Sequence, residues 1–452
     1  MLHQSIAAGE VAYTSLAELL GSFSYALDIT EGQPAGHSLR SALIGSRIGR
    51  AIGLSASERH SLYYTILLKD LGCSSNAARI CELYQADDRA FKHGYKTVGT
   101  SLAATLVFIF SRTAARAPWR ERASAIGHIL RNGDDIAQDL IVTRCTRGAD
   151  IARTLRFDES VCEGIFHLDE HWDGSGRPSH LRGDAIPLFS RIALLAQIAD
   201  VFHEHAGAQA AMDELRRRAG VWLDPELVDV ACRLGAEESF WSELQAPGLE
   251  ARAAVFAPPT EAVLVDDDYL DDIARAFGEV IDAKSPFTAG HSSRVADLSS
   301  SLSLSLGLDQ GASRSVRRAA YLHDVGKLGV SNNILDKPAG LTDPEWQEMR
   351  AHADHTREIL GRIGPLAALA DTAAAHHERL DGRGYPLGLS GSNVSLETRI
   401  ITTCDFFDAI TADRPYRSAM GLDAALGVMK QEVGTALDPL CFDALEAIAK
   451  QG

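Results

Sequence analysis

Two adjacent histidines followed by a glycine-rich turn form the most chemically informative stretch of the sequence, AHHERLDGRGYP at residues 375–386. Neighbouring imidazoles close to carboxylates are the kind of ligand set that binds a divalent transition metal. The Asp-Gly-x-Gly segment that follows predicts a tight turn beside them. We therefore expect a metal centre to be anchored at His376 and His377.

Five more side chains of metal-binding type occur in the same half of the chain, each at the end or on the inner face of an expected helix. They are His291, His323, Asp324, His352 and Asp405. With the adjacent pair they make seven ligands. That is too many for one ion and suits two octahedral ions that share a carboxylate, for which Asp324 is the expected bridge. Nitrogen and oxygen ligands without thiolate favour iron or manganese, with zinc, nickel or cobalt as alternatives.

Two ions a few ångströms apart can drive in-line displacement at phosphorus, with a bridging hydroxide as the nucleophile. Basic residues nearby fit a phosphate substrate. Lys327 follows Asp324 by three positions, and Arg414 and Arg417 lie just beyond the last ligand. Lys327 could instead be a cation at a helix C-terminus, and the two arginines could pair with neighbouring acids. Both interpretations stay open on these residues alone.

The elements that position these residues are predicted to be helices. Apolar residues recur at helical spacing over 268–284, and Thr342 with Glu345 forms a capping box ahead of His352. Ser55 and Glu58 have the same spacing. The acidic run at 266–272 is typical of a helix N-terminus rather than a calcium site. Almost no alternation of period two occurs, so we expect an all-α protein.

The first half of the chain repeats the second. GHSLRS at 36 matches GHSSRV at 290, LKDLGCSSNAARI at 68 matches LHDVGKLGVSNNIL at 322, and LDEHWDGSGRP at 168 matches HHERLDGRGYP at 376. The first two blocks are spaced identically in both copies. Between the second block and the next ligand position, the first copy has 75 residues against 29, which is an insertion of 46. We interpret the chain as a tandem repeat with one long insertion.

The first copy has lost most of the chemistry. The seven ligand positions correspond there to His37, Lys69, Asp70, Arg144, Leu168, Asp169 and Gln197. Lysine and arginine at these positions repel a metal cation. The three basic positions become Cys73, Ala206 and Gln209. The first copy is thus expected to bind no metal and to be a regulatory, dimerising or partner-binding module, or simple structural support.

Composition limits the function further. The net charge of −17 argues against broad binding of nucleic-acid polymers. Seven scattered cysteines, no signal peptide and no apolar run long enough for a bilayer indicate a cytoplasmic protein with reduced thiols and no membrane association. Four histidines outside the motifs are expected at the surface: His180, His203, His205 and His355. Cys404 is expected to be a packed small residue.

The blocks GHSSRV, HDVGKLG, HADHTREIL, HHERLDGRGYP and DFFDAITADRPYR, in this order over roughly 265–440, resemble the HD-GYP domain of the HD-domain phosphohydrolases. The resemblance implies two divalent ions. The first is implied to be bound by His291, His323, Asp324 and Asp405, and the second by Asp324, His352, His376 and His377. It also implies that His323, Asp324 and Lys327 belong to the catalytic machinery. Lys327, Arg414 and Arg417 would contact the substrate phosphates, and the turn with Tyr385 would shape the loop beside the site.

The function that this resemblance implies is hydrolysis of a cyclic dinucleotide, mostly cyclic di-GMP, to linear pGpG or to GMP. Alternatives are a phosphodiesterase for another cyclic dinucleotide such as cyclic GMP-AMP, an HD-family di-iron oxygenase, or a non-catalytic signalling adaptor. Some relatives have a glutamate where this chain has Phe287, linked with a third metal. We therefore expect two ions and mainly the linear dinucleotide.

The expected domain organisation follows from the repeat and a proline-containing segment between its copies. A degenerate HD-like domain at 1–245 is followed by a linker at 246–264 and a catalytic HD-GYP domain at 265–452. A homodimer or a regulatory partner could form through the first domain.

Overall fold

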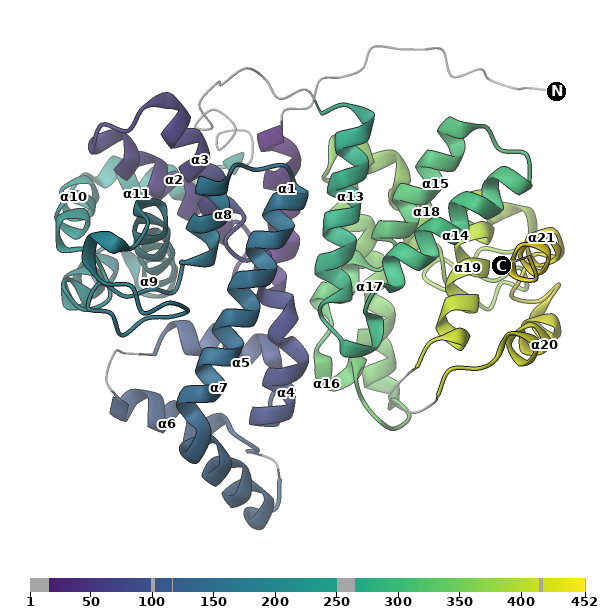
Figure 1. Ribbon diagram of the computed structural model, residues 1–452, viewed down its shortest axis with the longest axis horizontal. Helices are drawn as coiled ribbons and strands as arrows, with labels where there is room; N and C mark the ends of the chain where they lie inside the picture. The colour runs from purple at the N-terminus through teal and green to yellow at the C-terminus, as the bar shows by residue number, and fades with distance from the viewer. Residues whose placement is uncertain (1–15, 99–101, 116, 250–264, 414–417, 452) are drawn as a thin grey trace.

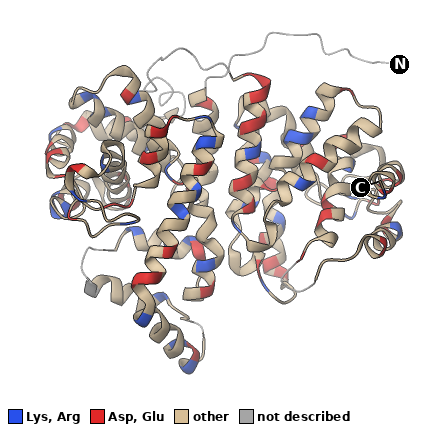
Figure 2. Cartoon of the chain, viewed as in Figure 1, with Lys and Arg blue, Asp and Glu red and all other residues tan. Residues whose placement is uncertain are grey.

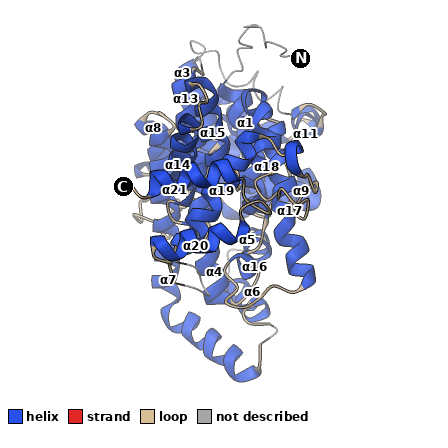
Figure 3. Ribbon diagram, turned by 90° about the vertical axis from the view of Figure 1, so that its right-hand side faces the viewer, coloured by secondary structure: helices blue, strands red, loops and turns tan. Residues whose placement is uncertain are grey.

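The computed structural model describes residues 16–98, 102–115, 117–249, 265–413 and 418–451. Within these residues the chain consists of α-helices and short 3₁₀ turns, and no β-strand is present (Figure 3). Three isolated bridges are the whole of the β-type pairing in this part of the chain. The prediction of an all-α protein is confirmed.

The first half of the molecule contains one bundle of helices, drawn from purple to teal in Figure 1. Its helices and 3₁₀ turns (η) are α1 Leu16–Thr30, α2 His37–Ala51, α3 Ala56–Leu67, η1 Cys73–Asn76, α4 Ala77–Tyr84, α5 Asp88–Lys96, α6 Leu102–Arg112, α7 Trp119–Thr154, α8 Glu159–Phe166, η2 Gly183–Ala185, α9 Leu188–Arg218, α10 Pro225–Gly235 and α11 Glu238–Gln245.

The second half forms the neighbouring bundle, drawn in green and yellow. Its elements are α13 Asp267–Asp282, η3 Pro286–Thr288, α14 His291–Ser305, α15 Gln310–Leu322, η4 Val325–Gly329, α16 Asn332–Leu335, α17 Asp343–Gly361, η5 Gly364–Leu369, α18 Ala370–Ala374, η6 Gly391–Asn393, α19 Leu396–Thr411, α20 Leu422–Glu432 and α21 Pro439–Ala449.

The helix starts follow the capping signals in the sequence. Ser55 and Glu58 form a complete capping box at α3, and Thr342 and Glu345 form another at α17. At α13 the Asp266 carboxylate accepts a hydrogen bond of 2.7 Å from the backbone N–H of Tyr269. The first turns of α13 are acidic in Figure 2. These contacts satisfy N–H groups that a helix leaves unpaired, and they confirm that the acidic run begins a helix.

The two bundles use the same internal hydrogen bonds at equivalent positions. Asp282 accepts a hydrogen bond of 2.7 Å from the Ser292 hydroxyl, and Asp28 accepts one of the same length from Ser38. Near the other end of each bundle, Arg399 donates to Asp438 at 2.9 Å and Arg191 donates to Asp224 at 2.9 Å. Matching buried contacts of this kind show that the repeat in the sequence is a repeat in structure.

The bundles share one apolar core that runs across the boundary between them. Phe23 of α1 and Phe277 of α13 are equivalent in the repeat, are both 0% exposed, and stack with ring centroids 3.6 Å apart. Around them α1 contacts η4 and α17, while α13 contacts η1 and α7. Equivalent residues that meet each other are the signature of a two-fold interface. The single chain therefore has the internal geometry of a dimer.

The insertion in the first copy follows residue 80 and forms the end of α4, α5, α6 and the first part of α7. The start of α4 corresponds in the repeat to the short α16, and the described part of the second copy has no counterpart of α5 or α6. In Figure 1 the insertion extends below the first bundle. Arg89 of α5 donates to the carbonyl oxygen of Gly329, so the insertion reaches the other copy as well as enlarging its own.

Of the expected linker at 246–264, residues 250–264 lie outside the described part of the chain. All seven cysteines lie in the described part of the chain and are free thiols. Cys404 is fully buried, as expected. None of the described helices combines the length and apolar composition needed to cross a membrane.

Replacing either ring of the central stack tests the shared core. Phe23→Ala or Phe277→Ala should lower the free energy of unfolding by about 3–5 kcal/mol, because each removes a fully buried ring. Phe110 is 43% exposed, so Phe110→Ala is the matched control. It should change stability by less than about 0.5 kcal/mol. Urea unfolding followed by circular dichroism measures both. A loss below about 1 kcal/mol at both central positions would contradict a shared core.

Candidate metal centre

Six separate elements bring the seven predicted ligands together inside the second bundle. His291 is the first residue of α14, His323 ends α15, Asp324 precedes η4, and His352 lies on α17. The adjacent histidines follow α18, and Asp405 lies on α19. Ligand atoms of overlapping triplets among them lie within 4.8 Å of one another. The residue types and the family resemblance had predicted the whole group as ligands, and the structure places these seven side chains close together.

The close approach of η4 to α17 depends on Gly326. A Cβ atom at this position would lie 1.9 Å from the carbonyl oxygen of His352, which no side chain could tolerate. The Gly326 N–H donates to the Thr356 hydroxyl at 3.0 Å, and that hydroxyl donates to the carbonyl oxygen of His323 at 3.0 Å. The glycine thus lets the backbone that carries Asp324 lie directly against the helix that carries His352.

The Asp324 carboxylate lies between two groups of histidines, with one oxygen facing each. Its Oδ2 is 3.4 Å from Nε2 of His323 and 3.7 Å from Nε2 of His291. Its Oδ1 is 3.6 Å from Nε2 of both His352 and His376. A carboxylate with this arrangement can bridge two ions, each of which has its own imidazole ligands.

The tautomers of four histidines are set by their outer nitrogens. Nδ1 of His323, His352 and His376 lies 2.6–2.7 Å from the carbonyl oxygen three residues earlier in the chain. A carbonyl only accepts, so Nδ1 carries the proton and Nε2 presents its lone pair to the centre. Nδ1 of His291 is 2.7 Å from the Asp408 carboxylate. Such outer partners orient metal-binding imidazoles.

Burial controls the charge of these groups. It lowers the pKa of His352 to about 4 and holds the pKa values of His376 and His377 well below the ordinary range. These imidazoles are therefore neutral, as metal ligands must be. Burial alone would raise the pKa of Asp324, but Lys327 and His323 outweigh it and keep the carboxylate ionised. Its Oδ1 is buried without a hydrogen-bond partner, so the site suits an added cation.

Two of the predicted substrate-binding residues are beside the centre. The Lys327 ammonium donates to Asp324 Oδ2 at 2.5 Å. The Tyr385 ring lies 4.7 Å from the His377 ring, and the Arg350 guanidinium carbon lies 5.4 Å from the centre of the tyrosine ring. Arg350 had no signal in the sequence, because an exposed arginine two residues before a ligand is unremarkable. Arg414 and Arg417 lie outside the described residues.

The turn with Tyr385 is held by a buried acid rather than by the metal ligands. The Glu378 carboxylate accepts hydrogen bonds from the N–H groups of Leu387 at 2.6 Å and Leu389 at 2.8 Å. At Gly384 a Cβ would lie 2.5 Å from the backbone of Glu378. Glu170 accepts the equivalent bonds in the first copy. The turn therefore belongs to the fold, whereas the histidines and tyrosine are special to the second copy.

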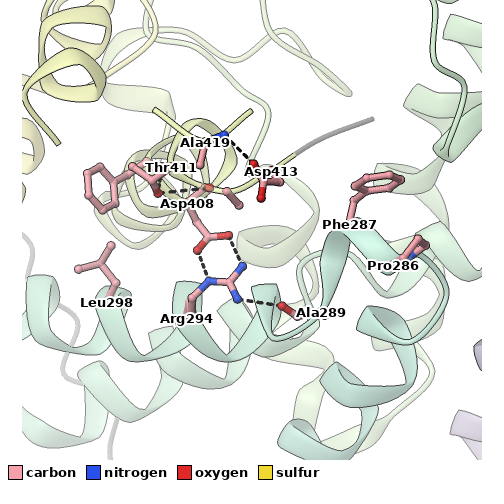
Figure 4. A pocket seen from close by; sticks show the side chains of 11 residues that line it. Pro286, Phe287, Ala289, Arg294, Leu298, Asp408, Thr411, Asp413 and Ala419 are labelled. Atoms are coloured by element: carbon pink, nitrogen blue, oxygen red, sulfur yellow. Dashed lines mark hydrogen bonds and ion pairs between the residues drawn. The ribbon is translucent and has the colours of Figure 1, made fainter. Parts of the chain in front are cut away.

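Two cavities open next to the centre. One of about 150 Å³ is lined by Lys284, His291, Asp324 and Lys327, among others. A wider one of about 510 Å³ is lined by Asp408 and Arg294 (Figure 4). There the Arg294 guanidinium donates two hydrogen bonds to the Asp408 carboxylate, one to each oxygen. Phe287, the residue in place of a glutamate, borders both. Asp408 was missed from the sequence, although its counterpart Asp200, beside His37, was a usable signal.

The first copy fills the same positions with paired charges. Lys69 forms an ion pair with Asp70, and Arg144 pairs with Asp169. The Leu168 side chain is buried where a histidine stands in the second copy. Glu31, Asp70 and Cys73 lie close enough to hold an ion, but Lys92 and Lys96 pair with Glu31. Ammonium and guanidinium groups of the chain thus neutralise these carboxylates, which opposes metal binding.

Two histidines differ from the surface location expected for them. His203 is only 6% exposed and stacks on Trp241 with ring centroids 4.5 Å apart, so the prediction of a solvated side chain was wrong. Helix α11, which supplies Trp241, covers this face of α9 and has no counterpart in the described part of the second copy. His355 is half-buried, with a fully enclosed Nδ1, because α17 packs on η4. His180 and His205 are exposed, as expected.

Comparison with known proteins gives consistent matches along the chain. The 3′3′-cGAMP-specific phosphodiesterase 3 of Vibrio cholerae is 52% identical over 431 residues, covering 95% of this chain and 94% of that protein. A crystal structure of a cyclic GMP-AMP-specific phosphodiesterase of V. cholerae aligns with a TM-score of 0.65 at 47% identity, over 97% of this chain and 98% of that one. The cyclic di-GMP phosphodiesterase response regulator RpfG of Xanthomonas campestris is 37% identical over 183 residues, 39% of this chain and 46% of that protein.

The family model described as HD domain matches two segments, residues 124–227 and 275–440, one in each copy of the repeat. The chain belongs to the HD domain family, in its HD-GYP branch.

Proposed function

We propose that this chain is a metal-dependent phosphodiesterase that hydrolyses a cyclic dinucleotide, with 3′3′-cGAMP as the leading substrate. The observation that supports it most is the Asp324 carboxylate, which offers one oxygen to each of two histidine groups. An HD-family protein that only binds partners has no need for a complete ligand set with outer hydrogen bonds. The non-catalytic adaptor is therefore the weaker alternative.

The centre is proposed to hold two divalent ions through the same seven residues that the sequence suggested. Imidazole and carboxylate ligands suit iron or manganese, and zinc, nickel and cobalt are compatible. When bound, such a pair supplies Lewis acidity at the scissile phosphate and activates water for attack. The chain supplies the rest, namely neutral imidazoles at His352, His376 and His377, an ionised bridge and outer hydrogen bonds that fix the ring orientations.

Lys327 is proposed to bind the phosphate that reacts. Its ammonium now neutralises Asp324 Oδ2 at 2.5 Å. With metal held by Asp324, the Lys327 ammonium would be free to donate to a non-bridging phosphate oxygen nearby. Tyr385 is proposed to border the bound nucleotide, because its ring lies at the edge of the histidine group. Arg414 and Arg417 keep their proposed phosphate or guanine contacts as an expectation from the sequence.

The similarity to known proteins changes which cyclic dinucleotide we place first as the substrate. The sequence resemblance placed cyclic di-GMP first, whereas a relative that covers 95% of this chain is named for 3′3′-cGAMP. The cyclic di-GMP phosphodiesterase RpfG aligns over less than half of this chain. We therefore place 3′3′-cGAMP first and cyclic di-GMP second, with the linear dinucleotide as the main product.

We also propose a different role for each copy of the repeat. Residues 265–452 are proposed to be the catalytic domain and residues 1–245 a metal-free domain that supports or regulates it, joined through 246–264. The ion pairs of Lys69 and Arg144 support this assignment.

The substrate assignment is tested by product analysis. Purified protein loaded anaerobically with iron or manganese should convert 3′3′-cGAMP to its linear dinucleotide, with kcat/KM at least about tenfold above that for cyclic di-GMP. Chromatography of the products measures both reactions in parallel. A higher kcat/KM for cyclic di-GMP would reverse the substrate order. No cleavage of either compound by metal-loaded protein would refute the phosphodiesterase.

Replacing the paired histidines by the residues at the equivalent positions of the first copy tests the second metal position. His376→Leu with His377→Asp should abolish cleavage and remove metal, because one histidine group then loses two of its three imidazoles. The circular dichroism spectrum should keep its helical form, since the first copy folds with these residues. His205→Leu, at an exposed histidine, is the control and should leave activity and metal content unchanged. Full activity of the double variant would contradict the ligand assignment.

The repeat offers a matched pair of variants for the metal count. His291 and His37 occupy equivalent positions and each contacts an aspartate at 2.7 Å. Elemental analysis of the loaded chain should give about two ions, as expected for a two-metal site. His291→Ala should lower the count, and His37→Ala should leave it unchanged. An equal loss from His37→Ala would show that the first copy also binds metal.

A further inference from the structure

Helix α5 of the insertion lies between the two equivalent turns η1 and η4. Its first residues contact the second copy, and residues one turn later contact the first. No equivalent of α5 exists in the described part of the second copy, where α16, the counterpart of α4, is followed by α17. The insertion therefore makes a one-sided contact with the turn that follows Asp324.

Asp88, in the first turn of α5, makes a fully buried contact with the second copy. This carboxylate is 0% exposed, and its Oδ1 accepts a hydrogen bond of 3.1 Å from the backbone N–H of Asn332, just after η4. Its Oδ2 lies 3.6 Å from the Lys284 ammonium and has no hydrogen-bond partner of its own. A buried charge of this kind is stable only beside its counter-charge. Asp88 and Lys284 therefore depend on each other across the boundary between the copies.

Lys284 carries this contact into the proposed catalytic cavity. Its side chain is 2% exposed, and its ammonium donates to the carbonyl oxygen of Leu328 in η4 at 3.3 Å. It lines the small cavity together with Asp324 and Lys327. A lysine held in this way fixes the far end of the turn that begins at Asp324.

Arg89 makes the second contact from the same helix. Its guanidinium donates to the carbonyl oxygen of Gly329, the last residue of η4, and to Glu348 on α17 at 3.2 Å. Helix α17 carries His352. One arginine from the first copy thus joins the turn that follows the bridging aspartate to the helix that carries a proposed ligand.

The other end of α5 makes a comparable contact with the first copy. Lys92, one turn after Asp88, donates to the carbonyl oxygen of Cys73 at 2.9 Å and to that of Thr30 at 3.4 Å. Cys73 is the counterpart of Lys327 in the repeat. The same helix therefore holds both turns, one in each copy.

We propose that Asp88 and Arg89 of the metal-free copy are positioning residues for the catalytic copy. By holding Asn332, Lys284 and Gly329, they fix the η4 turn and with it the placement of Asp324 and Lys327. The inference rests on the proposed phosphodiesterase for its effect on rate, but not for its effect on the backbone. It gives the insertion a specific task within the reaction.

The test compares Asp88→Asn and Arg89→Gln in the full chain with Arg79→Gln. Arg79 lies on the preceding helix α4 but is exposed and pairs with Glu82 of the same helix, so it is a matched control. Two quantities are measured. One is hydrogen exchange of the backbone amides in and next to η4. The Lys327 N–H donates to the carbonyl oxygen of Asp324 at 2.8 Å, and the Val330 N–H donates to that of Lys327 at 3.0 Å. The other is kcat and KM with 3′3′-cGAMP at saturating metal.

Both positioning variants should exchange the η4 amides about tenfold faster and lower kcat about tenfold, with KM within about twofold of the unmodified chain. Arg89→Lys, which can still donate to the Gly329 carbonyl, should restore most of kcat. Arg79→Gln should change neither quantity. Faster unfolding with unchanged η4 exchange and unchanged kcat in the folded fraction would overturn the proposal and leave α5 a structural support.

Failure of the positioning role and failure of the phosphodiesterase give different results. If the unmodified chain cleaves no cyclic dinucleotide, the proposed function fails. The exchange of the η4 amides then still decides whether Asp88 and Arg89 hold the turn. If the unmodified chain is active and both variants retain its kcat, the positioning role is refuted alone.

Discussion

A buried carboxylate that needs a counter-charge is the constraint on which this structure depends. Asp324 and its counterpart Asp70 are each 1% exposed, at the same position of two copies of one fold. A carboxylate removed from water is stable only when cations or hydrogen bonds compensate it. In the first copy the neighbouring Lys69 does so permanently. In the second copy histidines surround the carboxylate and Lys327 contacts it from one side, which leaves a place where added cations are favourable.

The different counter-charges explain why metal binding is expected in the second copy and not in the first. A covalently attached ammonium cannot leave, so the first copy is expected to fold without metal and to have no reaction to perform. Neutral imidazoles around an open oxygen give the second copy a centre that is proposed to take up ions. Because the copies meet through equivalent residues, with Phe23 stacked on Phe277, the first copy also completes the core of the second. The insertion adds polar contacts to this apolar boundary, and they reach the turn after Asp324.

Much of this could be predicted from the sequence, and the reasons are physical. The all-α fold followed from helical spacing, and the capping boxes at Ser55 and Thr342 followed from side-chain chemistry. The grouping of the ligands followed from residue types, because five histidines and two aspartates on the inner ends of helices have a common use as metal ligands. The turn at Gly384 could be assigned to the fold, because both copies keep it.

What escaped prediction depends on packing between segments far apart in the chain. His203 is covered by Trp241 of α11, a helix whose position no local pattern gives. Asp408 contacts the imidazole of His291, and Arg350 lies over the Tyr385 ring, so neither has a recognisable motif of its own. The contacts of Asp88 and Arg89 with the second copy could not be foreseen either. An insertion is visible in a sequence, but the surface against which it packs is not.

The positions of metal ions in crystals of the full chain test the role of the buried carboxylate most directly. Data collected at the manganese absorption edge, after anaerobic soaking with Mn²⁺, locate each ion by its anomalous scattering. We expect two peaks about 3.5–4 Å apart, one on each side of Asp324, and none beside Asp70. A single peak in the second copy, or any peak beside Asp70, would contradict the claim that one buried carboxylate is neutralised by ions in one copy and by the chain itself in the other.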